Sequence, residues 1–404
     1  MARGVLGAAP YSFEAVCACV GKAAMNSKRK RKARRFGILC FVGGCLSVAV
    51  SVMLTAQAHT KATIVAREVS TMPVQHTDDR RATVMGMATG YKIGDYKRYV
   101  GSLRRTGYRG HIILGLNPDT KPAILEYLKS RQVTVKLLQW VNCTYGSESL
   151  PADARCAHPY PDIKTRWSRF PLQRDWLKSC DTCTGPVLIT DVRDVIFQRN
   201  PFGPDAPRVE GLQVFEEHPN QTTQHWLTEW PLRECKNVTY FKPMLCSGTT
   251  AGTREAMLRY LEAMHREMKE WMTRPEWHFK IHGDDQTIHN HLFYSGQLPG
   301  ATAIKHRQNG LVHTVGHQAA RILRAHFEDT KLRLNATTKE EASAKWPFRG
   351  AQSVKQWLSP ELKLIDEEGY MTEADGSRSF VVHQWDRFGP RFWFWISAQG
   401  IADK

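Results

Sequence analysis

The sequence predicts an α/β protein in which a doubly wound, mainly parallel sheet is flanked by helices and follows a single N-terminal transmembrane helix. After residue 81, short apolar runs alternate with amphipathic segments, a pattern typical of parallel sheets with covered faces. Of the 404 residues, 42% are hydrophobic and 10% are aromatic, which favours a folded body over disorder. Residues 36–56 carry no charge and are long enough to cross the ~30 Å hydrocarbon core of a membrane as a helix.

The charge of the N-terminal region predicts how that helix is oriented. The chain has a formal net charge of +17, and about half of the excess lies in residues 1–35, mostly in the basic block 28–35. A basic block before an apolar span follows the positive-inside rule, so we expect a cytosolic tail at 1–35, a signal anchor at 36–56 and a lumenal remainder. A signal peptide cleaved after Ala56 or Ala58, an organelle transit peptide and a nuclear-localisation or nucleic-acid patch are the alternatives. The length and late start of the span, directly after the basic block, favour the anchor.

The remainder of the chain divides into a short stem and one large domain. Residues 57–80 are polar and lack a sustained period, which is typical of a stem between a membrane and a folded domain. Residues 81–395 form the expected lumenal domain. Within it, residues 329–346 are basic and rich in Ser, Thr and Lys, which predicts a surface insertion extending to about residue 378.

Strands and helices are expected to alternate from the start of this domain. Residues 82–89 form an apolar run, and the following helix has Tyr96, Tyr99, Val100 and Leu103 on one face, with Gly107 just past its end. The expected elements, in chain order, are a strand at 82–89, a helix at 95–105, a strand at 111–116, a helix at 118–131, a strand at 133–141, a helix at 166–178, strands at 186–190 and 211–216, and a helix at 254–269. Thr253 is the expected N-cap of the last of these, and Glu255 lies in its first turn.

Cysteines and glycosylation sequons agree with a lumenal domain. Six of the ten cysteines follow the apolar span: Cys143, Cys156, Cys180, Cys183, Cys235 and Cys246. Disulfides in an oxidising lumen are the preferred interpretation, with 15 possible pairings that the sequence does not separate. The Cys-x-x-Cys pair is also compatible with a redox or zinc half-site, but no second pair follows at ligand spacing. Four Asn-x-Ser/Thr sequons, at Asn142, Asn220, Asn237 and Asn335, all follow the span.

Two carboxylates directly after an apolar strand are the most informative motif. Val187–Ile189 leads into Asp191 and Asp194, and open α/β sheets place their ligands at this end of a strand. Carboxylate oxygens suit Mg²⁺ or Mn²⁺, whose remaining coordination positions phosphate oxygens can fill. A helix N-cap or an Asx turn is the alternative for either residue.

The segment from this strand to Pro201 resembles GT-A glycosyltransferases, in which a DxD motif at a strand end binds a metal and a nucleotide-sugar diphosphate. Counting back from Pro201, Asp194 occupies the place of the second acid, Val192 that of the first, and Asp191 lies one position earlier. The resemblance therefore implies Asp194 as the first choice of metal ligand, with Asp191 assisting. Arg193 either lies beside the diphosphate or forms a salt bridge with a surface acid.

Two later acids are candidates for the acceptor side of the same site. Asp284 and Asp285 follow Gly283 and precede a helical pattern in which Ile288 and Leu292 share a face. GT-A enzymes often carry acids here, so the resemblance implies that Asp285 or Asp284 orients an acceptor hydroxyl or acts as a base. Capping of the following helix is the alternative.

A late histidine and a glycine complete the predicted site. A strand-like run ends at His383, where GT-A folds commonly supply a metal ligand, and a neutral imidazole suits Mn²⁺. His313 is the competing histidine. Gly248 lies in Cys246–Thr249, which is expected to be a loop lining the donor or acceptor pocket, or only a turn with a disulfide.

The resemblance covers residues 82–390 in the order of elements and implies a function. We expect a Golgi type II membrane glycosyltransferase that moves a sugar from a nucleotide-diphosphate sugar to a glycan or glycoprotein acceptor with Mn²⁺ or Mg²⁺, and that does not bind nucleic acid. Inversion and retention are both compatible with these residues. A lumenal metal-dependent nucleotide or phosphoester hydrolase and a non-catalytic sugar-binding membrane protein are the alternatives.

Overall fold

The computed structural model describes residues 79–145, 155–273, 284–316, 364, 366, 368 and 370–388. The chain separates into two units, Met1–Pro73 and Val74–Lys404, and every described residue belongs to the second. The predicted tail, the anchor at 36–56 and the surface insertion at 329–346 lie outside the described residues. Among the residues that are described, no helix is long and apolar enough to span a membrane.

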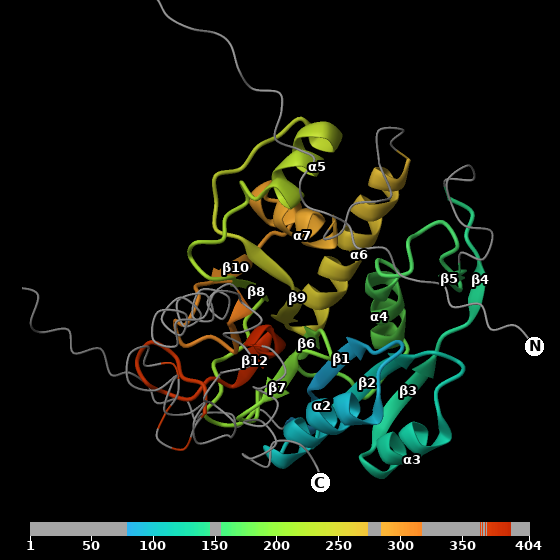
Figure 1. The fold of residues 1–404 in the computed structure, drawn as a ribbon, viewed down its shortest axis with the longest axis vertical. Helices are drawn as coiled ribbons and strands as arrows, with labels where there is room; N and C mark the ends of the chain where they lie inside the picture. Colours follow the sequence, from blue (N-terminus) through green and yellow to red (C-terminus); the bar gives the residue numbers. More distant parts are fainter. Residues whose placement is uncertain are drawn as a thin grey trace, which may run out of the picture. The chain divides into compact units, whose positions relative to one another are not determined.

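A seven-stranded sheet forms the centre of the described unit (Figure 1). Its strands, in spatial order, are β10 (Ala301–Ile304), β8 (Leu212–Glu216), β9 (Leu245–Gly252), β6 (Val187–Thr190), β1 (Thr83–Met87), β2 (His111–Leu116) and β3 (Val133–Leu137). All neighbouring pairs are parallel except the two that involve β9, which is antiparallel to both β6 and β8. The prediction of a mainly parallel sheet is therefore confirmed.

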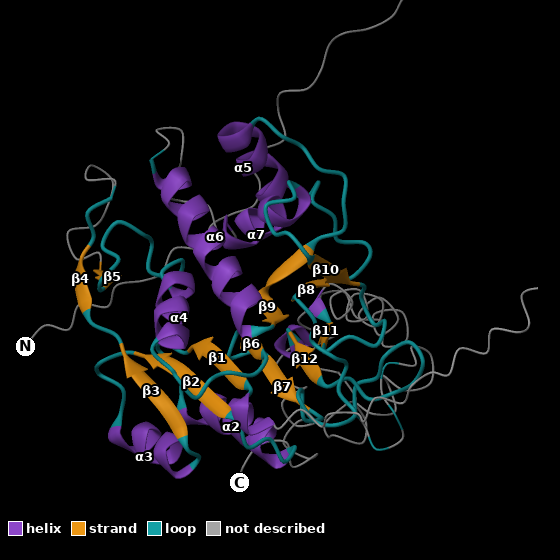
Figure 2. Ribbon diagram, turned by 180° about the vertical axis from the view of Figure 1, so that it is seen from behind, coloured by secondary structure: helices purple, strands orange, loops and turns teal. Residues whose placement is uncertain are grey.

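Helices cover both faces of this sheet, as expected from its continuous apolar strands (Figure 2). The helices are α2 (Ile93–Arg105), α3 (Pro122–Ser130), α4 (Arg169–Lys178), α5 (Trp226–Lys236), α6 (Arg254–Met272) and α7 (Asp284–Tyr294). Alternate residues of β1 enter different cores, because Val84 packs with residues of α2 and α3 whereas Met85 packs with residues of α4, α6 and α7. Burial on both faces explains why the strands are continuous apolar runs in the sequence, whereas the covering helices are apolar on one face.

Several predicted boundaries are correct, and two predictions about strands are wrong. β2 has the predicted bounds, and Thr253 caps α6 by accepting a hydrogen bond from the Ala256 amide at 3.3 Å. The strand predicted at 133–141 is instead divided, because β4 (Trp140–Asn142) leaves the central sheet and pairs with β5 (Arg155–Ala157). The loop predicted at Cys246–Thr249 is part of β9, all of whose residues are buried. Burial between two strands overrides the low strand propensity of its small residues.

A second sheet of three strands joins the C-terminal region to the middle of the chain. Its order is β11 (Val312–Thr314), β12 (Val381–His383) and β7 (Val195–Phe197). β12 pairs antiparallel with β7, and His383 lies opposite Val195 in the register. The strand predicted to end at His383 is therefore present, and it lies next to the residue that follows Asp194.

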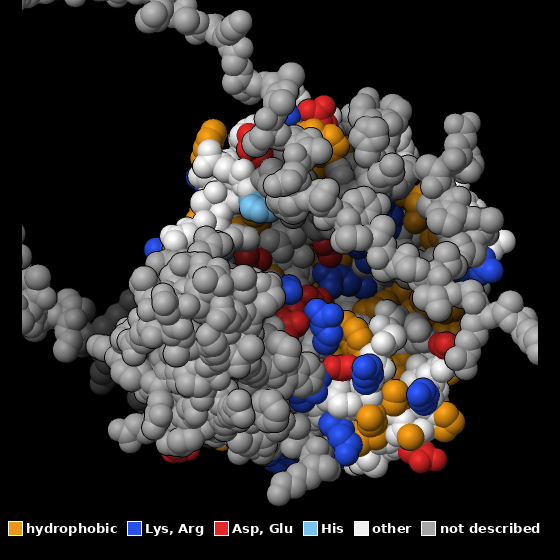
Figure 3. Space-filling model, viewed as in Figure 1, with side chains coloured by type: hydrophobic (Ala, Val, Ile, Leu, Met, Phe, Trp, Pro, Cys, Tyr) orange, Lys and Arg blue, Asp and Glu red, His pale blue; other side chains and the backbone are white. Residues whose placement is uncertain are grey.

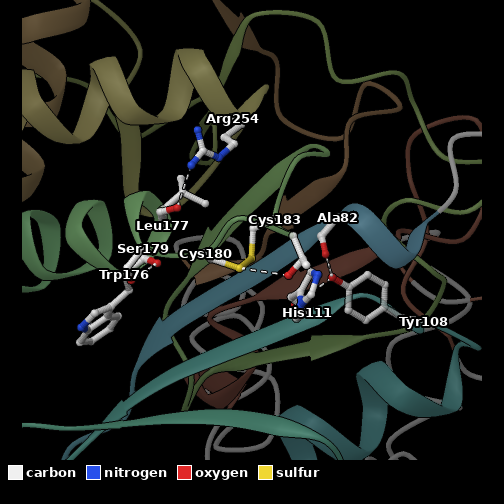
Figure 4. The surroundings of a disulfide bond; sticks show 10 residues. Ala82, Tyr108, His111, Trp176, Leu177, Ser179, Cys180, Cys183 and Arg254 are labelled. Atoms are coloured by element: carbon white, nitrogen blue, oxygen red, sulfur yellow. Dashed lines mark hydrogen bonds between the residues drawn. A yellow bond between two sulfur atoms is a disulfide. The ribbon is translucent and has the colours of Figure 1, made fainter.

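Four of the six cysteines form disulfides, namely Cys143 with Cys156 and Cys180 with Cys183. Figure 4 shows the second disulfide with His111 beside it. Its sulfurs are bonded to each other, so the disulfide interpretation of the Cys-x-x-Cys pair is the correct one. Cys235 and Cys246 take part in no disulfide, so the expectation that all six cysteines pair is wrong. Three of the four sequon asparagines, Asn142, Asn220 and Asn237, are exposed, and Asn335 lies outside the described residues.

Candidate metal and active site

Two acidic side chains lie on the segment that links β6 to β7. β6 ends at Thr190, and the backbone amide of Asp191 donates to the carbonyl of Gly248 at 2.7 Å, which ties the start of the segment to β9. The amide of Gln384 donates to the carbonyl of Asp194 at 2.8 Å, which ties its end to the segment after β12. Both acids are therefore held by backbone hydrogen bonds from neighbouring elements.

His383 meets these two carboxylates. Its Nε2 lies 3.5 Å from Oδ2 of Asp191 and 3.9 Å from Oδ1 of Asp194, and one ligand atom from each residue lies within 4.8 Å of the others. His383 is 1% exposed, and its Nε2 has no hydrogen-bond partner among the described residues. A buried polar atom without a partner is costly, and a bound cation would satisfy it. Two carboxylates and an imidazole suit Mn²⁺, so the predicted ligand set of Asp191, Asp194 and His383 fits a divalent metal.

Gly248 provides the space next to this cluster. A Cβ at this position would lie 2.5 Å from Oδ2 of Asp191, 2.6 Å from Cε1 of His383 and 2.9 Å from its Nε2. Real Cβ atoms essentially never approach other atoms this closely. Gly248 therefore lies beside the cluster as a strand residue, and the absence of a side chain leaves room for Asp191 and His383.

Arg169, the first residue of α4, joins the two predicted halves of the site. Its Nη1 donates to Oδ1 of Asp191 at 2.5 Å and its Nη2 donates to Oδ2 of Asp285 at 2.6 Å. The same Nη2 also donates to the carbonyl of Ser247 at 3.3 Å. Sequence reasoning missed Arg169, because no local motif marks a lone arginine at the start of a helix.

The two acids predicted for the acceptor side lie at the start of α7. Asp285 is a first-turn residue whose carboxylate pairs with Arg169, and its Oδ1 accepts from the amide of Gln286 at 3.0 Å. Asp284 begins the helix, and its side chain lies outside the described ones. Asp285 is thus linked through one guanidinium to the carboxylate of Asp191.

The charges in the site act strongly on one another. Burial would raise the pKa of Asp191, but Arg169 and His383 more than offset it and hold that pKa well below its usual value. Burial and the neighbouring charge of Asp191 raise the pKa of Asp194. Burial would lower the pKa of His383, but Cys246 and the two carboxylates raise it well above its usual value. Burial, together with both carboxylates, raises the pKa of Tyr91 to about 12, which places this hydroxyl in the same electrostatic environment.

Arg193 and His313 do not join the cluster. The Nη2 of Arg193 lies 3.2 Å from Oδ2 of Asp386, and its side chain is 51% exposed, which matches the alternative of a salt bridge with an acid. His313 is buried on β11, where its Nδ1 lies 3.1 Å from Oγ of Ser379. A different cation, Arg387, places its Nη2 4.0 Å from Oδ2 of Asp194.

Glu217 is a buried acid near the site that sequence reasoning also missed. It follows β8, is 5% exposed, and its Oε1 accepts from Nε2 of Gln286 at 3.0 Å. Burial raises its pKa above the usual value for a glutamate. In the space-filling view, acidic and basic side chains gather in a hollow near the middle of the face (Figure 3).

Comparisons with protein-family models and with curated proteins find no match for this chain.

Proposed function

We propose that this protein is a metal-dependent glycosyltransferase that moves a sugar from a nucleotide-diphosphate sugar to a glycan or glycoprotein acceptor. One observation carries the proposal: Asp191, Asp194 and Nε2 of His383 converge beyond the C-terminal end of β6. Open α/β sheets bind their ligands at this end, and a divalent cation held there suits a diphosphate.

The residues of the site have distinct proposed roles. Asp194, Asp191 and His383 would hold the cation, which when bound supplies Lewis-acid stabilisation of the charge that develops on the diphosphate leaving group. Arg169 holds the carboxylates of Asp191 and Asp285 at a fixed separation. Asp285 would face the acceptor side, where it can orient a hydroxyl group.

The cellular setting is proposed on sequence grounds. The basic block 28–35 and the apolar span 36–56 support a type II membrane protein. The two disulfides and the exposed sequon asparagines are consistent with a lumenal domain. The Golgi membrane is the expected location, because that is where such transferases act on glycoproteins.

The test uses the purified full-length chain and a panel of nucleoside diphosphates and nucleotide sugars. A ligand that binds only the folded state raises the midpoint of thermal unfolding, so we expect Mn²⁺ together with one nucleoside diphosphate to raise it more than either alone. The matching nucleotide sugar should then release its nucleoside diphosphate with transfer of the sugar to an acceptor. Asp194→Ala should remove nearly all of this activity while leaving the fold intact.

Three outcomes count against the proposal. Release of inorganic phosphate would identify the hydrolase alternative instead. Binding of sugars without turnover would favour the non-catalytic binding protein. Mn²⁺-dependent turnover that is unchanged in Asp194→Ala would refute the metal assignment.

A further inference from the structure

A cavity of about 410 Å³ lies at the end of the central sheet that is opposite to the candidate metal site. It is lined by Leu212, the first residue of β8, and by Ala256 in the first turn of α6. Gly252 pairs with both Leu212 and Val187, the first residue of β6, so the parallel strands β6 and β8 begin at this end. The candidate metal site follows the other end of β6. The volume is in the range of small-molecule sites, ~300–1,000 Å³.

The floor of the cavity is apolar. One face of α6 contributes Ala256, Tyr260 and Ala263, which are each at most 5% exposed. Leu298, in the turn before β10, adds a further buried apolar side chain. The hydroxyl of Tyr260 lies 2.8 Å from Nδ1 of His289, so the polar atom of this side chain is engaged inside the protein. The two alanines leave the space that larger side chains would fill.

Three cations surround this floor. Arg259 and Arg266 share a face of α6, and Lys178 is the last residue of α4. All three are exposed, and none of them forms an ion pair with another described residue. Glu262 is the one acid among the residues that line the cavity, and its carboxylate lies 2.6 Å from Nη1 of Arg174. The rim is therefore positive, because its only acid already has a partner.

The walls of the cavity are tied to each other. Nη2 of Arg254 donates to the carbonyl of Leu177 at 3.1 Å, which joins the start of α6 to the end of α4 (Figure 4). The ion pair of Arg174 with Glu262 joins the same two helices one to two turns further along α6. The cavity is therefore pre-formed, as most small-molecule sites are.

We propose that this cavity binds a small amphipathic anion, whose apolar body lies on the alanine-lined floor and whose acidic group meets Arg259, Arg266 and Lys178. Removal of the apolar body from water favours binding, and guanidinium groups form strong charge-assisted hydrogen bonds to carboxylate, phosphate or sulfonate oxygens. The inference goes beyond the proposed function and does not depend on it.

The experiment titrates the full-length chain with naphthalene-2-sulfonate by isothermal calorimetry. The protein is held in phosphatidylcholine nanodiscs without metal, and empty nanodiscs supply the blank. We expect saturable binding of one probe per chain. Naphthalene-2-sulfonamide lacks the charge and inorganic sulfate lacks the apolar body, so each should bind at least about 10-fold more weakly.

Variants of the rim and the floor locate the probe. Arg259→Gln combined with Arg266→Gln should weaken binding at least about 10-fold, and the fold should persist because both residues are exposed. The matched control combines Arg233→Gln with Lys269→Gln, which removes as much charge from exposed positions of α5 and α6 outside the cavity and should leave binding unchanged. Ala263→Leu fills part of the floor without changing charge and should also weaken binding.

The results that refute this site differ from those that refute the proposed function. Absence of saturable binding, equal affinity for the sulfonate and the sulfonamide, or an equal loss in the control pair would each refute the site. Displacement of the probe by Mn²⁺ with a nucleoside diphosphate would place the probe at the candidate metal site and would also refute it. Failure of the protein to bind Mn²⁺ or any nucleotide would instead refute the proposed function and leave the cavity site standing.

Discussion

Gly248→Ala is the sharpest test of the geometry of the site. The added Cβ would lie 2.5 Å from Oδ2 of Asp191 and 2.6 Å from Cε1 of His383, whereas carbon needs about 3.5 Å to a non-bonded neighbour. One or both ligands must therefore move by about 1 Å. Metal–ligand distances tolerate only about ±0.2 Å, so a displacement of this size would move Asp191 or His383 out of coordinating distance of a shared cation.

The expected effect on metal binding is larger than that on stability. Overpacking of a buried position costs about 1–3 kcal/mol of unfolding free energy. Mn²⁺ affinity should fall by at least about 100-fold, because a ligand itself is displaced rather than one of its outer partners. Thermal unfolding measures the first quantity, and paramagnetic resonance of free Mn²⁺ measures the second.

Gly252→Ala is the matched control in the same strand. A Cβ at Gly252 would meet the carbonyl of Gly211 at 3.1 Å and Cδ1 of Leu212 at 3.3 Å, so this variant is also crowded, but away from the carboxylates. It should lose stability and keep wild-type Mn²⁺ affinity. Wild-type Mn²⁺ affinity in Gly248→Ala would refute the argument that Asp191 and His383 form one site beside this glycine.

Three further predictions concern stability and its pH dependence. Arg169→Met should cost ~1–3 kcal/mol at pH 7, because it leaves the partly buried carboxylates of Asp191 and Asp285 unpaired. The difference from wild type should narrow below about pH 4, because the lowered pKa of Asp191 stabilises the fold only while that group is ionised. A constant difference down to pH 2 in chemical denaturation would argue against the pairing. Burial lowers the pKa of His289 to about 3, so the unfolded chain binds a proton at pH values where the folded chain does not. Between pH 6.5 and 3 the unfolding free energy of the wild type should therefore fall, relative to His289→Gln, by ~1.4 kcal/mol per pH unit. Parallel plots of unfolding free energy against pH for the two proteins would contradict this. Replacing Cys143 and Cys156 by serine opens a loop with a sequence separation of 13 and should lower the free energy of unfolding by about 3 kcal/mol, measured by urea denaturation. An unchanged urea midpoint would contradict this prediction.

The sequence was most informative where local pattern and final environment agree. The apolar run before Asp191 is a buried strand, and its carboxyl end could be expected to carry ligand groups whatever the rest of the chain did. His383 could be proposed for the same reason, since it ends a short apolar strand. Convergence of the two strand ends depends on the antiparallel pairing of β12 with β7, which joins segments far apart in the chain and has no local signal.

Arg169 and Glu217 were not predicted because their roles depend on tertiary contacts. Arg169 and Glu217 are single charged residues without a motif, and their importance arises only from what surrounds them after folding. Each is buried or partly buried against groups on other elements: Arg169 against two carboxylates, and Glu217 against Gln286. Burial of a charge is the physical signal that identifies them, and burial is decided by tertiary packing rather than by sequence spacing.

The error about β9 is informative about the site itself. A central strand is normally rich in β-branched and aromatic residues, yet Leu245–Gly252 consists mostly of small residues. This composition matches what the strand must do, because its carbonyl at Ser247 accepts from Arg169, its thiol at Cys246 meets His383, and Gly248 leaves the space beside Asp191. A valine at position 248 would improve strand propensity and fill that space. Local sequence rules are expected to fail where a functional site imposes its own requirements, and β9 breaks them at the residues that contact the candidate metal ligands.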